Sequence, residues 1–373
     1  MGDYAVTVLP GDGVGPEVTE QALEVLLTVA DLYEHKLTIH RRLAGLASIA
    51  AEGVAISEAT MQTCAESDAI LFGAIGSLPA HERQNAKVKP EQALFRLRKD
   101  FQFFANLRPI RPSRSLYSAS PLKPNYLEGT DLIFVRELSA GLYYGHLESI
   151  PGKPSEIRRT EQGEEAIDTL LYTEQEIERV VRAAFDIAVA RRRKVTSVDK
   201  ANVLSSSILW RRIVDRVAAD YPTVSYEHIL VDACAMYLIR EPSRFDVIVT
   251  ENLFGDILTD EASMLTGGIG MIPSASLGVR RTRSGTFGLY EPIHGSAPDI
   301  EGQDKANPVA AVLSAAMLLR HSLGLHEEAL AVEAAVEEVI QDGYRTVDIQ
   351  EEGTKVIGTR EMGKRIATAV RRP

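Results

Sequence analysis

The chain has 373 residues, a formal net charge of −11, and 45% hydrophobic and 25% charged residues. This length and composition predict two domains, and the negative charge argues against a general nucleic-acid-binding or membrane-binding surface. The 2 cysteines lie outside any CxxC pair and no apolar run reaches the roughly 18 residues of a transmembrane helix, so we expect a cytoplasmic protein without a zinc site, disulfide framework or membrane span.

Short apolar segments alternate with segments of helical spacing along most of the chain. The first apolar run, 4–9, leads into a glycine-rich turn and then into helical spacing over 17–30. Pro16 stands where the third glycine of a G-x-G-x-x-G fingerprint belongs, which disfavours an ordinary Rossmann domain. Further strands are expected at 37–42, 69–74, 131–137, 195–199, 226–231 and 246–250, and further helices at 174–193, 206–219, 308–323 and 327–340. The pattern predicts an α/β protein with parallel strands and ligands at their carboxyl ends.

Two polar, glycine-bearing segments interrupt this alternation. Residues 153–171 are expected to form either a hairpin arm that reaches a partner subunit or a surface loop. Residues 280–288 are expected to form a loop between two packed segments.

Three arginines follow or approach the ends of expected elements. Arg98 lies in a helical context, Arg108 in Asn-Leu-Arg-Pro, and Arg136 directly after an apolar run. Guanidinium groups so placed suit bidentate binding of a small polyanion. Arg98 could equally be a surface cation, whereas Arg136 is expected to need an anion in a cleft.

Two residues are candidates for proton transfer. Tyr143 lies in a glycine-flanked turn that could aim its phenol into a cleft, although the pattern does not separate it from Tyr144. Lys200 follows an expected strand and could transfer a proton if burial lowers its pKa, although a solvated lysine is the commoner case there.

Three aspartates could bind a divalent cation. Asp256 and Asp260 are four residues apart, which stacks them on one face of a helix, and a solvated helix face is the alternative. Asp232 ends a strand and could instead be a helix N-cap. Together they offer the hard oxygen ligands that Mg²⁺ or Mn²⁺ prefers.

The segment 291–300 and the nearby Asn307 offer donors and acceptors for a nucleotide. His294, Gly295 and Ser296 supply backbone and side-chain groups, and Asp299 could accept from ribose hydroxyls, although a plain turn is the alternative. A carboxylate at this point repels a 2′-phosphate, which favours NAD over NADP.

Taken together, the sequence blocks resemble the isocitrate/isopropylmalate family of β-decarboxylating dehydrogenases, and within it the isopropylmalate branch. The resemblance covers nearly the whole chain and is carried by LPGDGVGPEV, ANLRP, VREL, SVDKANVL, FDVIVTENLFGDILTD, PSASLG, HGSAPDI and ANP. It implies a two-domain fold with a largely parallel sheet, in which 1–103 and 267–373 form an NAD-binding domain. The second domain, 104–266, would carry the metal ligands, an arm at 152–171 and the dimer interface.

The resemblance also implies roles for particular residues. Tyr143 and Lys200 would be the catalytic acid/base pair, and Asp232 and Lys200 would come from the second subunit of a homodimer. The implied substrate-binding residues are Arg98, Arg108, Arg136 and Asp232, with Glu91, Leu94 and Phe95 at the substrate's side chain. The implied metal ligands are Asp232, Asp256 and Asp260, and the implied NAD-binding residues are Val14, Glu291, His294, Gly295, Ser296, Ala297, Asp299, Ile300 and Asn307.

The implied activity is NAD- and Mg²⁺-dependent oxidative decarboxylation of 3-isopropylmalate to 2-oxoisocaproate, in leucine biosynthesis. Two departures from the family pattern are Phe95, where leucine is common, and Ala140, where glycine is common. Sister enzymes that act on malate, tartrate, isocitrate or homoisocitrate are the alternatives. A Mg²⁺-dependent phosphoryl-transfer enzyme is disfavoured because the G-x-x-x-x-G-K-[ST] loop is absent from the sequence, and a non-enzymatic metal-binding module is disfavoured further.

Overall fold

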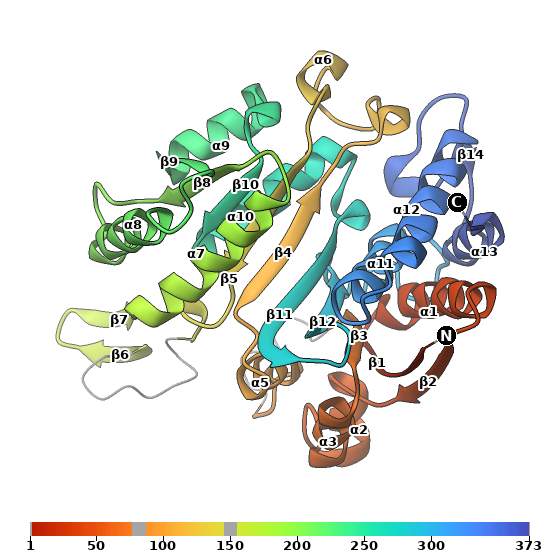
Figure 1. Ribbon diagram of the computed structural model, residues 1–373. Coiled ribbons are helices and arrows are strands. Elements are labelled where there is room, and N and C mark those ends of the chain that lie inside the picture. The colour runs from red at the N-terminus through yellow and green to blue at the C-terminus, as the bar shows by residue number, and fades with distance from the viewer. Residues whose placement is uncertain (1, 77–86, 145–154, 373) are drawn as a thin grey trace. The chain divides into compact units, whose positions relative to one another are not determined.

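The computed structural model describes residues 2–76, 87–144 and 155–372 (Figure 1). These form two compact units, one of Met1–Phe103, Pro112–Pro124 and Ser263–Pro373, the other of Phe104–Arg111 and Asn125–Ala262. The short segment 112–124 therefore belongs to the first unit, not to the second as the expected boundaries had it. Hydrogen bonds tie it there, because Ser113 Oγ donates to Glu337 at 2.8 Å and Arg345 donates to the Ser115 carbonyl at 2.7 Å.

In the first unit, five strands lie next to one another in the main sheet, in the order β2-β1-β3-β12-β11. They are β1 (Asp3–Gly11), β2 (Lys36–Arg41), β3 (Ala69–Ala74), β11 (Pro273–Arg281) and β12 (Thr286–Pro292). All neighbours pair in parallel except β11 and β12, which are antiparallel. The expected loop at 280–288 is confirmed only over 282–285, since β11 extends to Arg281 and β12 begins at Thr286. Arg280 lies in β11, and its guanidinium stacks 3.4 Å from the centre of the Phe287 ring.

Helix α11 is the central helix of the first unit, and nearly every one of its side chains is buried, as its uniformly apolar sequence requires. It packs against α1 and α12, and α13 packs against both of these helices (Figure 1). The helices of this unit are α1 (Gly15–Leu32), α2 (Leu46–Glu52), α3 (Glu58–Glu66), α5 (Gln92–Asp100), α11 (Val309–His321), α12 (His326–Gln341) and α13 (Thr359–Ala369), and β13 (Tyr344–Arg345) pairs with β14 (Lys355–Val356).

In the second unit, five strands lie next to one another in the main sheet, in the order β4-β5-β10-β8-β9. They are β4 (Ala105–Ile110), β5 (Leu132–Glu137), β8 (Lys194–Asp199), β9 (Ser225–Leu230) and β10 (Val247–Thr250). Only β4 runs antiparallel to its neighbour, so the carboxyl ends of the other four lie at one edge. The predicted α/β class with a largely parallel sheet is confirmed.

Among the helices of the second unit, α7 begins at a side-chain cap, whereas α8 and α9 begin without one. In α7, Thr173 Oγ1 accepts from the Glu176 amide while the Glu176 carboxylate accepts from the Thr173 amide, a reciprocal capping box. The helices are α6 (Pro124–Leu127), α7 (Glu174–Val189), α8 (Ser205–Ala218), α9 (Val231–Arg240) and α10 (Asn252–Ser263), and the short 3-10 turn η2 covers Leu142–Tyr144.

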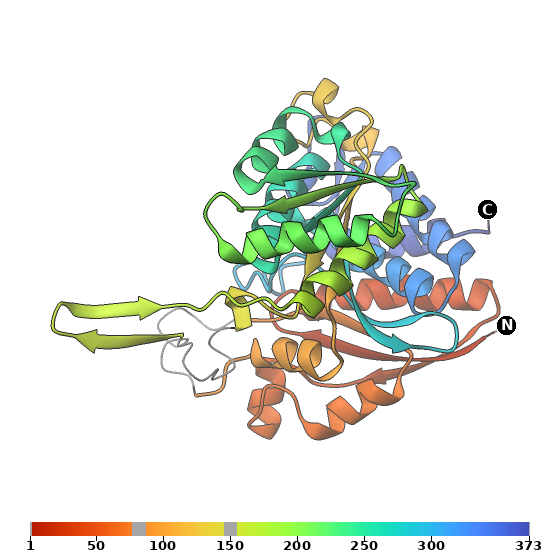
Figure 2. The ribbon, with the colours of Figure 1, turned by 60° about the vertical axis from the view of Figure 1, so that its left-hand side comes forward.

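A two-stranded hairpin, β6 (Glu156–Thr160) and β7 (Gly163–Ile167), forms most of the polar segment 153–171. Figure 2 shows it extending away from the strands and helices of its unit. Its Ile157 side chain is 75% exposed. Of the two predicted forms, the hairpin is therefore the one found, although 152–154 lie outside the described residues and contact with a partner subunit stays a prediction. Among the helices that the structure describes, none combines the length and apolar character needed to cross a bilayer.

Candidate active site

The site is organised around helix α10, which begins directly after strand β10. Glu251 forms the start of the helix, since its carboxylate accepts hydrogen bonds from the amides of Leu253 at 3.2 Å and Phe254 at 2.8 Å. Acidic side chains suit a helix N-terminus because the first amides carry a partial positive charge. Asn252, Asp256 and Asp260 then follow at intervals of four residues, which places them along one face of α10.

Asp256 is the carboxylate on which three other side chains converge. Arg136 donates to its Oδ1 from Nη1, Arg108 Nη2 lies 3.4 Å from the same oxygen, and the Tyr143 hydroxyl donates to Oδ2 at 2.7 Å. Arg136 and Arg108 are only 2% and 6% exposed. Buried guanidinium groups require anionic partners, and the Asp256 carboxylate is that partner for both arginines.

Both arginines are held by asparagine side chains. Asn252 Oδ1 accepts from Arg136 Nε at 2.9 Å and from Nη2 at 2.7 Å. Asn106 Oδ1 accepts from Arg108 Nε at 2.7 Å, and Thr259 Oγ1 accepts from Arg108 Nη1 at 2.6 Å. Two bonds to one planar fork fix its orientation as well as its position, so the arginines are preorganised.

Tyr143 is distinguished from its neighbour by its contact with Asp256. Burial and the Asp256 carboxylate raise the pKa of the Tyr143 phenol to about 12. The Arg136 guanidinium lies 5.6 Å from the centre of the Tyr143 ring. At neutral pH the phenol therefore carries its proton and can act as an acid.

The face of α10 that carries Asp256 and Asp260 fits a hard divalent cation. Burial and the neighbouring Asp256 charge raise the pKa of Asp260, which is the effect expected of two carboxylates one helical turn apart. A cation between them would remove this repulsion, and carboxylate oxygens are the donors that Mg²⁺ and Mn²⁺ prefer. Within 2–76, 87–144 and 155–372, no three His, Cys, Asp or Glu side chains gather into a metal site, so this chain's Asp232 does not join the pair.

Asp232 instead forms an ion pair with Lys200. Lys200 follows β8 and its amide donates to Ser207 Oγ at 3.0 Å. Asp232 lies in the first turn of α9, where the hydrogen bond from Lys200 lowers the pKa of its carboxyl. The alternative of Asp232 as an N-cap is wrong, because Leu230 occupies that position. Lys200 and Asp232 are both accessible to solvent, with side-chain exposures of 28% and 58%.

In the first unit, Arg98 is buried and pairs with Glu291 at 3.2 Å. The alternative of Arg98 as a surface cation is therefore wrong. Glu91 precedes α5, and Leu94 and Phe95, in its first turn, are partly exposed, so their proposed part in a substrate pocket stays a prediction.

The glycine-rich turn after β1 packs directly on the segment predicted to bind NAD. The Val14 amide donates to the Ser296 carbonyl at 2.8 Å, and a Cβ at Gly13 would lie 2.0 Å from that oxygen. Gly295 faces open space, since a Cβ there would meet nothing within 4 Å, and Asp299 is exposed. Open backbone beside an accessible carboxylate fits the sugar and phosphates of a nucleotide.

The remaining residues of that segment have structural partners. Ala297 adopts a positive φ of 38°, and the Ile300 amide donates to its carbonyl at 3.1 Å. Asn307 Oδ1 accepts from the Val309 amide at 3.0 Å and thereby helps to start α11. His294 Nδ1 lies 2.9 Å from the Gly295 carbonyl oxygen. Their roles in NAD binding stay predictions.

The sequence reasoning missed Asn252, Asn106 and Thr259. Asn252 could have been found by extending the four-residue interval of Asp256 and Asp260 backwards, and Asn106 because it shares a strand face with Arg108 two residues on. Thr259 gave no comparable signal.

Comparison with known proteins identifies the family. The pattern of the isocitrate/isopropylmalate dehydrogenase family matches residues 5–366. The chain is 53% identical to a 3-isopropylmalate dehydrogenase of Priestia megaterium over 366 residues, 98% of this chain and 95% of that one. It is 51% identical to a 3-isopropylmalate dehydrogenase of Dehalococcoides mccartyi strain 195 over 369 residues, 99% of each chain.

Solved structures of the same kind resemble it. The isocitrate dehydrogenase of Methylococcus capsulatus matches with a TM-score of 0.83 and 32% identity, covering 99% of this chain and 100% of that one. A β-decarboxylating dehydrogenase of Thermococcus kodakarensis matches with a TM-score of 0.75 and 34% identity, covering 98% and 96%. The chain belongs to the isocitrate/isopropylmalate dehydrogenase family.

Proposed function

We propose that this protein is a cytoplasmic enzyme of leucine biosynthesis that oxidises 3-isopropylmalate with NAD and releases CO₂, giving 2-oxoisocaproate and NADH. The observation that carries the proposal is the 53% identity, over nearly the whole chain, to a 3-isopropylmalate dehydrogenase. The identity to the isocitrate dehydrogenase of Methylococcus capsulatus is 32%. The higher identity favours the isopropylmalate branch over the isocitrate branch.

Arg108 and Arg136 bind the substrate carboxylates in this proposal. Both are buried, both are oriented by an asparagine, and both already face the Asp256 carboxylate. The two guanidinium groups therefore need not reorient when a substrate carboxylate binds. Preorganised charges of this kind contribute most of the transition-state stabilisation in many enzymes. Arg98 of the first unit is the third proposed arginine.

Asp256 and Asp260 would hold Mg²⁺ or Mn²⁺, with Asp232 as a further ligand from a second subunit. Such a cation, when bound, supplies Lewis-acid stabilisation of negative charge on the substrate oxygens, and NAD supplies the hydride acceptor. Val14, Glu291 and the segment from His294 to Asn307 would bind NAD.

Lys200 and Tyr143 handle the protons. Lys200, in its neutral amine form, accepts the proton of the 2-hydroxyl group as the hydride passes from carbon 2 to NAD, and loss of CO₂ from the resulting 2-oxo acid follows. Tyr143 then donates a proton to carbon 3, for which its raised pKa keeps it protonated. Lys200 must reach the same substrate as Tyr143, and its exposed pairing with Asp232 leaves it available to a neighbouring chain.

A homodimer with shared sites follows from this assignment. Three exposed apolar side chains support it: Ile157 of the hairpin, Met236 of α9 and Ile257 of α10, which are 75%, 65% and 59% exposed. Large exposed apolar side chains are typical of surfaces that associate, and two of these three lie on α9 and α10, the helices that carry Asp232 and Asp256.

The activity is tested by NADH formation from 3-isopropylmalate, with malate, tartrate and isocitrate in parallel, and with and without EDTA. The proposal expects 3-isopropylmalate to give the highest kcat/KM and EDTA to abolish turnover. A higher kcat/KM with one of the other three acids would assign the chain to a sister activity.

The shared site is tested by mixing two inactive variants, Asp256→Asn and Asp232→Asn, after dissociation and reassociation. If Asp232 acts on the partner's substrate, each mixed dimer regains one intact site, and activity rises to about a quarter of the wild-type value. If both aspartates served one chain's own site, the mixture would stay inactive. Each variant refolded alone is the matched control.

A further inference from the structure

Asn252, the first residue of α10, contacts two parts of the site at once. Its Oδ1 accepts both hydrogen bonds from Arg136, and its Nδ2 donates to the Ala140 carbonyl at 3.0 Å. Ala140 belongs to the turn 138–144, which carries Tyr143. One side chain therefore joins a substrate-binding arginine to the segment that bears the proposed acid.

The chemistry of these partners admits one orientation of the amide. Arg136 offers only donors, so the amide oxygen must face it, and the Ala140 carbonyl is an acceptor, so the amide nitrogen must face that. Asn252 is 1% exposed, and its side-chain oxygen and nitrogen both form hydrogen bonds with protein groups. It is therefore sequestered from substrate, and any effect on the reaction passes through the groups it holds.

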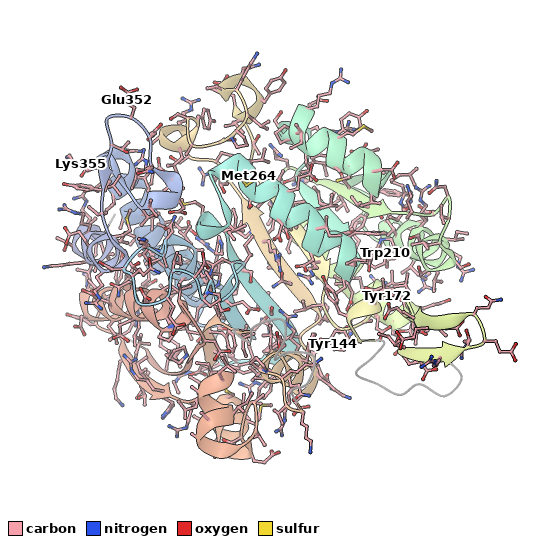
Figure 3. The ribbon with its side chains drawn as sticks, turned by 180° about the vertical axis from the view of Figure 1, so that it is seen from behind. Tyr144, Tyr172, Trp210, Met264, Glu352 and Lys355 are labelled. Carbon is pink, nitrogen blue, oxygen red and sulfur yellow. The ribbon has the colours of Figure 1, made fainter. Side chains whose placement is uncertain are left out.

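Asn252 is itself fixed by its neighbours. The Tyr172 hydroxyl accepts a hydrogen bond from the backbone N–H of Asn252 at 3.0 Å and donates one to Glu251 Oε2 at 3.2 Å. The Tyr172 ring lies edge-on to the Trp210 ring, with centroids 6.0 Å apart; both residues are labelled in Figure 3. These contacts hold the first residues of α10 in place.

The same tyrosine lies against the turn. A Cβ at Gly141 would be 2.5 Å from the Tyr172 hydroxyl, and the Gly141 amide donates to the Leu171 carbonyl at 3.3 Å. At the other end of the turn, the buried Glu137 carboxylate accepts from the amides of Ser139 and Ala140. Contacts at both ends of the turn 138–144 therefore fix its distance from α10.

We propose that Asn252 is a positioning residue that fixes Arg136 and Tyr143 relative to one another. The inference rests on the proposed function, since it concerns the same site. Its consequence is that losing the Nδ2 donor displaces Tyr143 even when Arg136 is still held. A displacement of about 1 Å at a reacting group lowers turnover by roughly a hundredfold.

The test compares Asn252→Ala, Asn252→Asp and Asn106→Ala, assayed with 3-isopropylmalate and NAD. Asn252→Asp keeps an oxygen towards Arg136 but replaces the donor to Ala140 by a second acceptor. Both variants of Asn252 are expected to lose roughly 10–100-fold in kcat. Asn106→Ala is the comparison variant, because it releases Arg108 without removing a hydrogen bond to the turn 138–144. It is expected to raise KM and to leave amide exchange over 138–144 at the wild-type rate.

Amide hydrogen exchange over 138–144 gives a second readout that is independent of substrate. Exchange there is expected to be faster in Asn252→Asp than in wild type, while unfolding temperatures show that the fold is kept. A kcat of Asn252→Asp within twofold of wild type overturns the proposal, as does unchanged exchange in this turn. If wild type itself forms no NADH from any of the four acids, the proposed function fails, and the exchange measurement alone decides the role of Asn252.

Discussion

Gly255 gives the sharpest test of the site's packing. A Cβ at this position would lie 2.7 Å from Cγ, 2.9 Å from Cβ and 3.2 Å from Cδ of Arg136, whereas ordinary contacts are 3.4–4 Å. In Gly255→Ala the arginine stem must therefore move by about 0.7 Å, the difference between 2.7 Å and 3.4 Å. The guanidinium resists this because Asn252 and Asp256 hold it.

Two effects on stability oppose each other in this variant. Alanine is favoured over glycine inside a helix by about 1 kcal/mol, while overpacking costs about 1–3 kcal/mol. The net change in the free energy of unfolding is thus expected to be about 2 kcal/mol or less. The displaced arginine should lower kcat/KM on the order of 100-fold, equivalent to about 2.7 kcal/mol of transition-state stabilisation.

The assay is kcat/KM for 3-isopropylmalate with NAD, alongside thermal unfolding and the oligomeric state of the same preparations. A folded Gly255→Ala protein with kcat/KM within threefold of wild type would refute the reasoning. It would mean that Arg136 can shift without consequence, and hence that its preorganisation is not used.

Three further predictions concern single groups. Tyr143→Phe and Lys200→Met should each lower kcat on the order of 100-fold or more while KM changes little, and near wild-type turnover in either would remove its assigned role. Asp256→Asn should abolish metal-dependent turnover but leave the protein folded, as judged by circular dichroism. Full activity would instead favour the alternative that this face of α10 is solvated and binds no metal. Burial raises the pKa of Glu137 from 4.5 to about 7, so the folded chain retains a proton that the unfolded chain releases. Relative to Glu137→Gln, wild type should therefore lose up to about 3 kcal/mol of stability as pH rises from 4.5 to 7, and a pH-independent difference would contradict this.

The order of elements could be predicted because buried strands appear in the sequence as short apolar runs, and helices with one buried face appear as apolar residues at helical spacing. The strand at 69–74 was predicted to the residue, and Asp256 and Asp260 do share one face of a helix. The loop expected at 280–288 was too long, because Arg280 is polar yet belongs to a strand, where it lies over an aromatic ring. Polarity alone does not reveal such a contact.

The site was only partly predictable for a different reason. For four residues the type of side chain alone indicates a chemical role, and the structure brings these four together: Arg108, Arg136, Tyr143 and Asp256. The part played by Asn252 depends on hydrogen bonds between segments more than 100 residues apart in sequence. The four-residue interval places Asn252 on the helix face of Asp256 and Asp260, but nothing in the sequence around it reveals that its side chain bonds both Arg136 and the Ala140 carbonyl.

The pairing of β12 with β3 affects the order in which the parts of the chain fold. β12 pairs with β3 although more than 200 residues separate them, so the sheet of the first unit cannot be completed until the region around residue 290 has been synthesised. The strands of the second unit all lie between residues 105 and 250. During translation, which proceeds from the N-terminus, we therefore expect the second unit to fold first, while the edge of β3 waits for its partner. An unpaired apolar edge of this kind is where chaperone binding or aggregation would begin.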